Sequence, residues 1–319
     1  MVQVSEPDEN GYVSMGVESG YTFQAVKSAK TVLAQVNKNV PRTFGDTSFH
    51  VSEIDRFVEC DMPLVESAPP VIGEVEQQIG KYCASLIEDG ATLQLGIGAI
   101  PDAVLAELKD KKHLGIHSEM IADGVIDLVE AGAIDCSEKT LDPGKMVVTF
   151  LMGTKRLYDF ANNNPMLELK PVDYVNDPQV IAKNNKMVSI NSALQVDFMG
   201  QVVACSIGTK QFSGVGGQVD FVRGAAMAED GKGVSIIAMP SVTIKKDGTV
   251  ISKIKPYIDH GAAVTTNRYD VDYIITEYGI ARMRGKNLKD RARALISIAH
   301  PDVREELKEE FVKRFNAEY

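Results

Sequence analysis

Apolar and polar residues follow two periods along the chain, and these periods predict alternating strands and helices. Continuous apolar runs bounded by glycine or proline are typical of strands buried in a parallel sheet. Strand-like runs of this kind, separated by glycine-rich turns, occupy residues 92–95, 146–153, 187–197, 201–208, 233–240 and 272–279. Residues 75–86 instead repeat apolar positions at helical spacing, and Gly90 is expected to end that helix. This order predicts an α/β protein with open, mainly parallel sheets and flanking helices.

One segment, Thr92–Glu119, combines a strand, a glycine turn, a helix and a second strand that is expected to stop at Glu119. A further helix is expected to follow at once, with Ile121 on its apolar face and Gly132 at its end. Ligands of open parallel sheets bind outside the carboxyl ends of the strands. Glu119 is therefore the leading candidate for chemistry or ligand contact.

Three interpretations of Glu119 follow from the residues alone. Gly96-x-Gly98 with an acidic residue about 20 positions on is most of a dinucleotide fingerprint, although Pro101 replaces its third glycine. Glu119 would then hold a ribose hydroxyl. Alternatively, the positive end of the next helix keeps Glu119 ionised as a nucleophile, with backbone N–H donors from the glycine turns at 96–100 and 214–218. In the third interpretation, Glu119 only offsets that helix dipole.

The two ends of the chain differ in pattern. Residues 1–66 are short apolar runs with turn signals, including strand-like residues 2–4 and 31–37, and the proline-containing residues 66–73 resemble a linker. We therefore expect a small first domain over 1–66 and a second over 67–319. Residues 288–319 are charged and helical, with a break at Pro301 that suits the start of a second helix.

Composition excludes several classes of function. The formal net charge of −10 argues against nucleic acid or an anionic membrane as the main partner. The chain has no apolar run of membrane-spanning length and no signal-peptide pattern at its start. Four scattered cysteines predict reduced thiols and a cytoplasmic protein, and the histidine spacing predicts no metal site.

Seven segments together resemble the acetyl-CoA hydrolase/transferase family, the class I CoA-transferases. They are SEPDENGYVSMG, NKNVPRTFGD, LQLGIGAIPDAV, GIHSEMIADG, FSGVGGQVDFVRGA, DYIITEYGIARMRGK and ALISIAHPDVREEL. The resemblance implies a CoA-transferase fold and exchange of CoA between a short-chain acyl-CoA (acetyl, butyryl or 4-hydroxybutyryl) and a free carboxylate. It implies a covalent thioester on Glu119, no cofactor beyond CoA as substrate, and a homo-oligomer. A CoA site and oxyanion hole are implied at Gly96, Ile97, Gly98, Ala99, Ile100, Gly216 and Gly217.

Four further residues are candidates for CoA or substrate contact, each with a structural alternative. Gln218 would bind the substrate carboxylate or only its own turn, and Asn176 would lie near the active site or cap a helix. Leu194 would touch the pantetheine arm or belong to the core. Lys245 would meet CoA phosphates or lie on a solvated turn.

The chain departs from the family at its N-terminus, where members carry most of an additional α/β domain. A catalytically silent fragment is therefore one alternative to the transferase. An acyl-CoA hydrolase on the same scaffold is another, and a nicotinamide-dependent oxidoreductase is a third.

Overall fold

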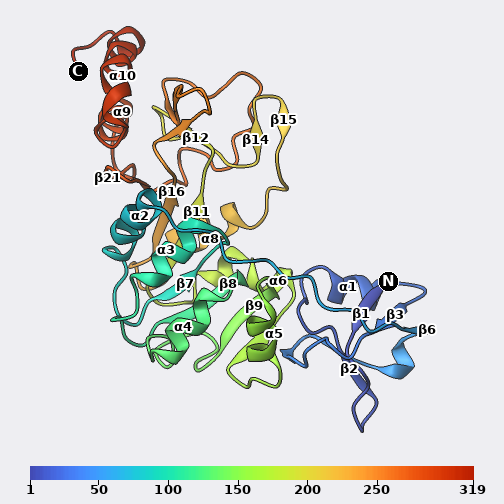
Figure 1. Cartoon of the computed structure of the whole chain (residues 1–319). Helices are drawn as coiled ribbons and strands as arrows, with labels where there is room; N and C mark the ends of the chain where they lie inside the picture. Colours follow the sequence, from blue (N-terminus) through green and yellow to red (C-terminus); the bar gives the residue numbers. More distant parts are fainter.

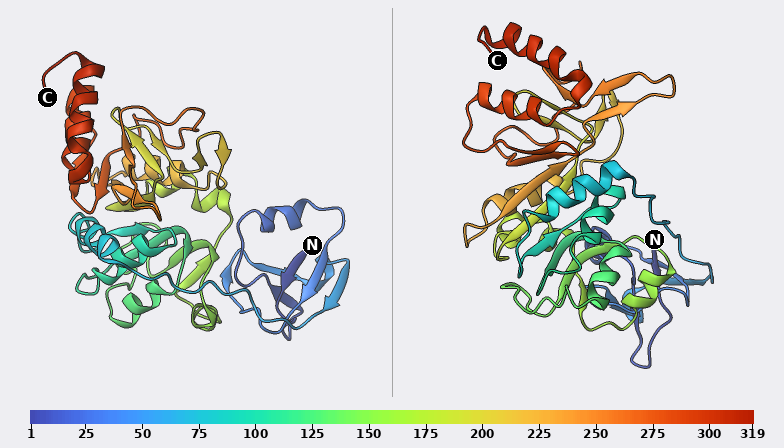
Figure 2. Two further views of the ribbon diagram at one scale, coloured as in Figure 1. Left: turned by 45° about the horizontal axis from the view of Figure 1, so that its top comes forward. Right: turned by 60° about the vertical axis from the view of Figure 1, so that its left-hand side comes forward.

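The computed structural model describes residues 1–319 and is built around one large twisted sheet with helices on both faces. In Figure 1, the N-terminal residues form a lobe at one side of this sheet, and the two C-terminal helices stand at the opposite end. Figure 2 shows the same separation from two other directions.

The nine-stranded sheet carries the candidate site. In spatial order its strands are β21 (Gly279–Arg282), β20 (Tyr273–Thr276), β16 (Val234–Ala238), β11 (Met187–Ser192), β7 (Thr92–Gln94), β8 (Gly115–Ile121), β9 (Met146–Leu151), β10 (Leu167–Leu169) and β4 (Phe44–Gly45). Every neighbouring pair is parallel except β20 and β21. The predicted α/β class and mainly parallel sheet are confirmed.

Helices cover the two faces of this sheet. One face packs into the largest core cluster with α2 (Glu74–Ala84), α3 (Ala99–Ala106), α4 (Gly124–Glu130) and α5 (Lys155–Ala161). A separate cluster joins the opposite face to α6 (Val172–Val175), α7 (Pro178–Ile181) and α8 (Gln218–Ala226). The expected end of α2 is wrong, because the helix stops at Ala84. Gly90, at φ +71°, instead lies in the turn before β7.

The N-terminal lobe has a sheet of its own. Its parallel strands are β1 (Val2–Val4), β3 (Leu33–Val36) and β6 (Arg56–Glu59), beside the β2 (Tyr12–Ser14) and β5 (Ser48–His50) pair, α1 (Thr22–Ser28) and the short helix η1 (Val51–Glu53). The strands predicted at 2–4 and 31–37 are confirmed. Residues 66–73 form no helix or strand, but β4 from this lobe pairs with β10, so the lobe also supplies an edge of the large sheet.

Beyond the large sheet, the second half of the chain adds short strands and two helices. The strands are β12 (Gln195–Asp197), β13 (Val202–Val203), β14 (Ser206–Ile207), β15 (Lys210–Gln211), β17 (Val242–Ile244), β18 (Val250–Ser252) and β19 (Ile254–Lys255). The predicted break at Pro301 is confirmed, since α9 (Leu288–Ser297) is followed by α10 (Pro301–Phe315) with proline in its first turn. No helix in the structure is long and apolar enough to cross a membrane.

The order of the strands creates a crevice between β7 and β11. From β7 the chain steps outward through β8, β9 and β10, and it then returns to add β11 on the other side of β7. The connections that leave β7 and β11 therefore diverge. Such a switch point is where open α/β sheets bind their ligands, outside the carboxyl ends of the strands.

Candidate active site

A cleft of about 350 Å³ lies at this switch point. It is lined by Gln94, Leu95, Gly96, Ile97, Glu119, Met120, Asn191, Ser192, Ala204, Cys205, Ser213, Gly214, Val215, Gly216, Gly217, Gln218 and Phe221. The cleft therefore brings together the ends of β7 and β11, strand β8 and the beginning of α8. Both glycine turns singled out from the sequence reach it.

Glu119 lies within β8 and not at its end. The strand continues to Ile121 because Met120 and Ile121 still pair with β9, and α4 begins only at Gly124. The expectation that Glu119 opens the next helix, with Ile121 on that helix, is wrong. The Thr149 hydroxyl on β9 donates to the Glu119 carbonyl at 2.9 Å, and the residues on both sides of Glu119 are buried. The carboxylate is thus carried by a fixed backbone.

The positive helix end at this carboxylate belongs to α8. Gly217 is the N-cap of α8, and a Cβ atom built on it would lie 2.2 Å from Glu119 Oε2. The first N–H groups of a helix have no partner within it and carry a partial positive charge. A helix end of the kind predicted to favour the ionised carboxylate therefore lies beside Glu119, but it comes from the face of the sheet opposite α4.

The two glycines of this turn serve different purposes. Gly216 has φ +59° and open space around it, so its backbone conformation favours glycine. Gly217 has an ordinary φ of −88°, but no side chain fits between its Cα and the Glu119 carboxylate. A positive φ explains the first glycine, and close approach of the backbone explains the second.

Asn176 is the only side chain with a hydrogen bond to the Glu119 carboxylate. Its Nδ2 donates to Glu119 Oε2 at 3.0 Å, and this contact fixes the orientation of the amide. Asn176 is buried at the C-cap of α6, while Asp177 provides the N-cap of α7 by accepting from the Gln179 N–H. Asn176 Oδ1 has no partner. The residue therefore faces Glu119 and does not start the next helix.

Gln218 uses both ends of its amide to hold the start of α8. Its Nε2 donates to the Ser192 carbonyl at the end of β11, and its Oε1 accepts from the Thr266 hydroxyl. The distances are 2.9 and 2.8 Å. In this arrangement the side chain fixes its own turn against the sheet.

The glycine turn after β7 forms the other wall of the cleft. Gly98 is the N-cap of α3 with φ +118°, and the Ser118 hydroxyl anchors the strand end by bonding both the Leu95 N–H and its carbonyl. Gly96 and Ile97 line the cleft, whereas Ala99 and Ile100 already belong to α3. Pro101 lies in the first turn of this helix, where its missing N–H leaves no bond unmade.

Comparison with known proteins shows to which family this chain belongs. Models of the acetyl-CoA hydrolase/transferase N-terminal and C-terminal domains match residues 1–67 and 153–311. The chain is 64% identical over 315 residues to 4-hydroxybutyrate coenzyme A transferase of Clostridium kluyveri, covering 99% of this chain and 72% of that protein. This protein belongs to the acetyl-CoA hydrolase/transferase family.

Two further relatives agree with this family assignment. Butyryl-CoA:acetate CoA-transferase of Anaerostipes caccae is 39% identical over 314 residues, covering 96% of this chain and 70% of that protein. The crystal structure of 4-hydroxybutyrate CoA-transferase from Porphyromonas gingivalis superposes with a TM-score of 0.87 at 48% identity, covering 98% of this chain and 74% of that one. The resemblance inferred from sequence motifs is confirmed.

Two candidates suggested by the resemblance do not line the cleft. Leu194 is in the connection between β11 and β12, because the predicted strand over 187–197 is broken there, and it does not line the cleft. Lys245 is an exposed residue beside the turn that joins β17 to β18. No three His, Cys, Asp or Glu side chains are grouped to hold a metal ion.

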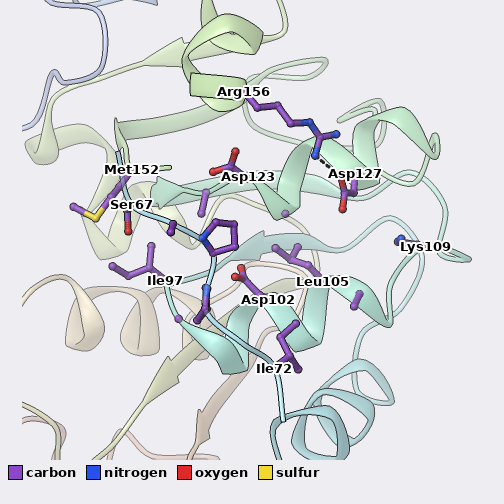
Figure 3. Close-up of a pocket in the computed structure, with 17 residues that line it drawn as sticks. Ser67, Ile72, Ile97, Asp102, Leu105, Lys109, Asp123, Asp127, Met152 and Arg156 are labelled. Carbon is purple, nitrogen blue, oxygen red and sulfur yellow. Dashed lines mark hydrogen bonds and ion pairs between the residues drawn. The ribbon is translucent and has the colours of Figure 1, made fainter. Parts of the chain in front are cut away.

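A second cavity, of about 490 Å³, lies on the other side of the glycine turn and shares Ile97 with the cleft. Figure 3 shows it between α3, α4 and the segment that begins at Ser67. Its carboxylates largely serve the fold: Asp123 accepts from the Thr154 N–H, and Asp127 pairs with Arg156 at 2.7 Å. This cavity is larger, but it does not contain Glu119.

Sequence reasoning missed the residues that arrive from distant segments. His117, two positions before Glu119 on β8, is fully buried against α6 and α8. Asp220, in the first turn of α8, has a pKa raised by burial and by the negative charge of Glu119. The alternation of a strand predicts that His117 and Glu119 share a face, but it does not say which helices cover that face.

Proposed function

We propose that this protein is a CoA-transferase that exchanges CoA between a short-chain acyl-CoA and a free carboxylate through a thioester on Glu119. The observation that carries the proposal is the convergence on Glu119 of a helix N-terminus at Gly217 and the amide of Asn176. The names of relatives support acetate, butyrate and 4-hydroxybutyrate as the acids to test.

The reaction begins with attack by a Glu119 carboxylate oxygen on the thioester carbonyl of acyl-CoA. Collapse of the tetrahedral intermediate expels the CoA thiolate and leaves an acyl–glutamyl anhydride. The thiolate then attacks the glutamyl carbonyl and releases the first acid as a carboxylate. Glu119 is left as a thioester of CoA, and no net proton is consumed.

The second half reverses these steps with a different acid. Its carboxylate attacks the glutamyl carbonyl and expels the CoA thiolate, which attacks the acyl carbonyl of the new anhydride. A new acyl-CoA leaves, and the Glu119 carboxylate is regenerated. One thioester replaces another of similar energy, which is why no redox or metal cofactor is needed in this scheme.

The cleft supports these steps in three ways. Strand β8 holds the nucleophile in place, which limits the loss of entropy at the reacting centre. The start of α8 and the turn at Gly96–Ile97 face the cleft with backbone groups that suit a developing oxyanion. Asn176 holds one carboxylate oxygen, so the other is the oxygen we assign to attack.

Mass spectrometry of the intermediate tests the proposal directly. Wild-type protein is incubated with acetyl-CoA, reduced with borohydride and digested, and the peptide containing Glu119 is examined for the mass of the reduced side chain. Glu119→Gln is the matched control, because it keeps the size and can still accept from Asn176. Unmodified Glu119 in folded wild-type protein contradicts the covalent mechanism.

A second measurement separates transferase from hydrolase activity. Labelled acetate is added with butyryl-CoA or 4-hydroxybutyryl-CoA, and formation of labelled acetyl-CoA is compared with release of free CoA. We expect acid-dependent exchange to exceed release of CoA. CoA release that is independent of added acid would assign hydrolysis.

A further inference from the structure

His117 is a fully buried histidine beside the proposed nucleophile. Its Nε2 is 2.9 Å from the Val175 carbonyl, which can only accept, so the proton of the neutral ring lies on Nε2. Nδ1 has no partner. Burial lowers the pKa of His117 to about 4, with a further contribution from the positive charge of Lys139. The ring therefore acts as a neutral donor at physiological pH.

The carbonyl that His117 holds is directly connected to the group that holds Glu119. Val175 is the last residue of α6, and the next residue is Asn176, whose amide donates to Glu119 Oε2. The hydrogen bond from His117 thus fixes the main chain one residue before the Asn176 side chain. This chain of contacts begins and ends on β8, where His117 and Glu119 lie on the same face of the strand.

His117 also packs against the second element that reaches Glu119. The ring of Phe221 on α8 lies 6.3 Å from the His117 ring, centroid to centroid. Phe221 donates its N–H to the carbonyl of Gly217, the residue in contact with the carboxylate. The same side chain therefore supports α6 through a hydrogen bond and α8 through an aromatic contact.

We infer that His117 is a positioning residue that sets the placement of Asn176 and Gly217 at the Glu119 carboxylate. This inference rests on the proposed function, in which Glu119 is the nucleophile. His117 has no access to the cleft and transfers no proton in the scheme. Its effect is transmitted through the Val175 carbonyl and through α8.

Three variants test the inference by kinetics. His117→Leu removes the donor, and we expect kcat for CoA exchange to fall roughly 10- to 100-fold with little change in KM for the acid. His117→Gln keeps an N–H near the position of Nε2 and should restore kcat to within about threefold of wild type. Thr276→Val is the control, because it removes a similar bond to the Ile298 carbonyl from a buried side chain on β20, four places from β8 in the sheet. It should lower Tm and leave kcat unchanged.

A double-mutant cycle with Asn176→Ala separates positioning from a general loss of stability. Because the two residues share the contact at Val175 and Asn176, the double variant should lose clearly less kcat than the product of the two single losses. Losses in kcat that multiply would overturn the inference, as would an unchanged kcat in His117→Leu. Failure of wild-type protein to form the Glu119 thioester would instead contradict the proposed function.

A measurement without turnover completes the test. In ¹⁵N-labelled protein, the side-chain amide signals of Asn176 are assigned by their loss in Asn176→Ala. His117→Leu should move these signals toward the positions of a free amide, and Thr276→Val should not. Signals that stay in place in His117→Leu would overturn the positioning role even if the protein has no transferase activity.

Discussion

The contact between Gly217 and Glu119 gives the sharpest prediction. In Gly217→Ala the new Cβ would lie 2.2 Å from Glu119 Oε2 and 2.4 Å from Asn176 Nδ2. Ordinary contacts at a Cβ begin at 3.4 Å, so the carboxylate or the start of α8 must move by about 1.2 Å. The backbone itself accepts alanine, because φ is −88°. The substitution therefore perturbs the site sterically and introduces no backbone strain at residue 217.

A displacement of about 1 Å at a reacting group lowers rates by roughly 100-fold. We expect Gly217→Ala to reduce the single-turnover rate of thioester formation with acetyl-CoA by about this factor. Overpacking should lower the free energy of unfolding by about 1–2 kcal/mol at most, since the carboxylate faces an open cleft. A rate within threefold of wild type would refute the assignment of Gly217 as the backbone wall of the nucleophile.

Gly231→Ala is the matched control for this experiment. Gly231 follows α8 with φ +69°, far from the cleft-facing end of the helix, and a Cβ atom built on it would have no neighbour within 4 Å. Alanine there should cost about 1 kcal/mol of stability through backbone strain and leave the rate unchanged. The two alanine variants thus separate a steric effect on catalysis from a conformational effect on folding.

Three other changes have defined outcomes. As the pH falls from 6.5 to about 4, unfolded protein binds a proton at His117 and folded protein does not, so the contribution of this residue to folding stability is lost. Urea unfolding should show the free energy of unfolding of wild type falling by about 3 kcal/mol relative to His117→Gln over this window. Gly45→Ala places Cβ 2.2 Å from the Leu169 carbonyl oxygen at φ +96°, and should lower stability by about 3 kcal/mol and speed proteolysis within residues 1–66. Gln218→Leu removes the bond to the Ser192 carbonyl and should lower kcat about 10-fold. The Thr276→Val control, which changes stability away from the cleft, should leave kcat unchanged.

Local patterns were sufficient to predict the strand, turn and helix around Gly96–Gly98 and the strand that carries Glu119. These features depend on apolar periodicity and on glycine at a positive φ, which neighbouring residues determine. The predicted end of β8 is wrong because pairing with β9 extends the strand two residues past Glu119. A tertiary contact of this kind overrides the local helix signal.

The partners of Glu119 could not be predicted from periodicity. Asn176 follows Glu119 by 57 positions, and Gly217 belongs to a loop whose glycines are equally typical of an ordinary tight turn. Their convergence depends on the return of the chain from β10 to β11, which places α6 and α8 on the same face of the sheet. The residues alone offered this turn as one possible source of N–H donors for Glu119, and the family motifs then indicated that the turn and Glu119 belong to one site.

The helix that begins beside Glu119 is α8 and not the expected α4, and this alters the chemical interpretation of the residue. A glutamate in the first turn of α4 would be a simple partner of the helix dipole, and its side chain would have no reason to face a cleft. In the observed arrangement the carboxylate is carried by one strand, bonded by Asn176 from a second element and approached by Gly217 from a third. A glutamate used only for helix stability does not require such convergence or a glycine that excludes every side chain. The geometry therefore supports the proposed nucleophile over the helix-capping interpretation.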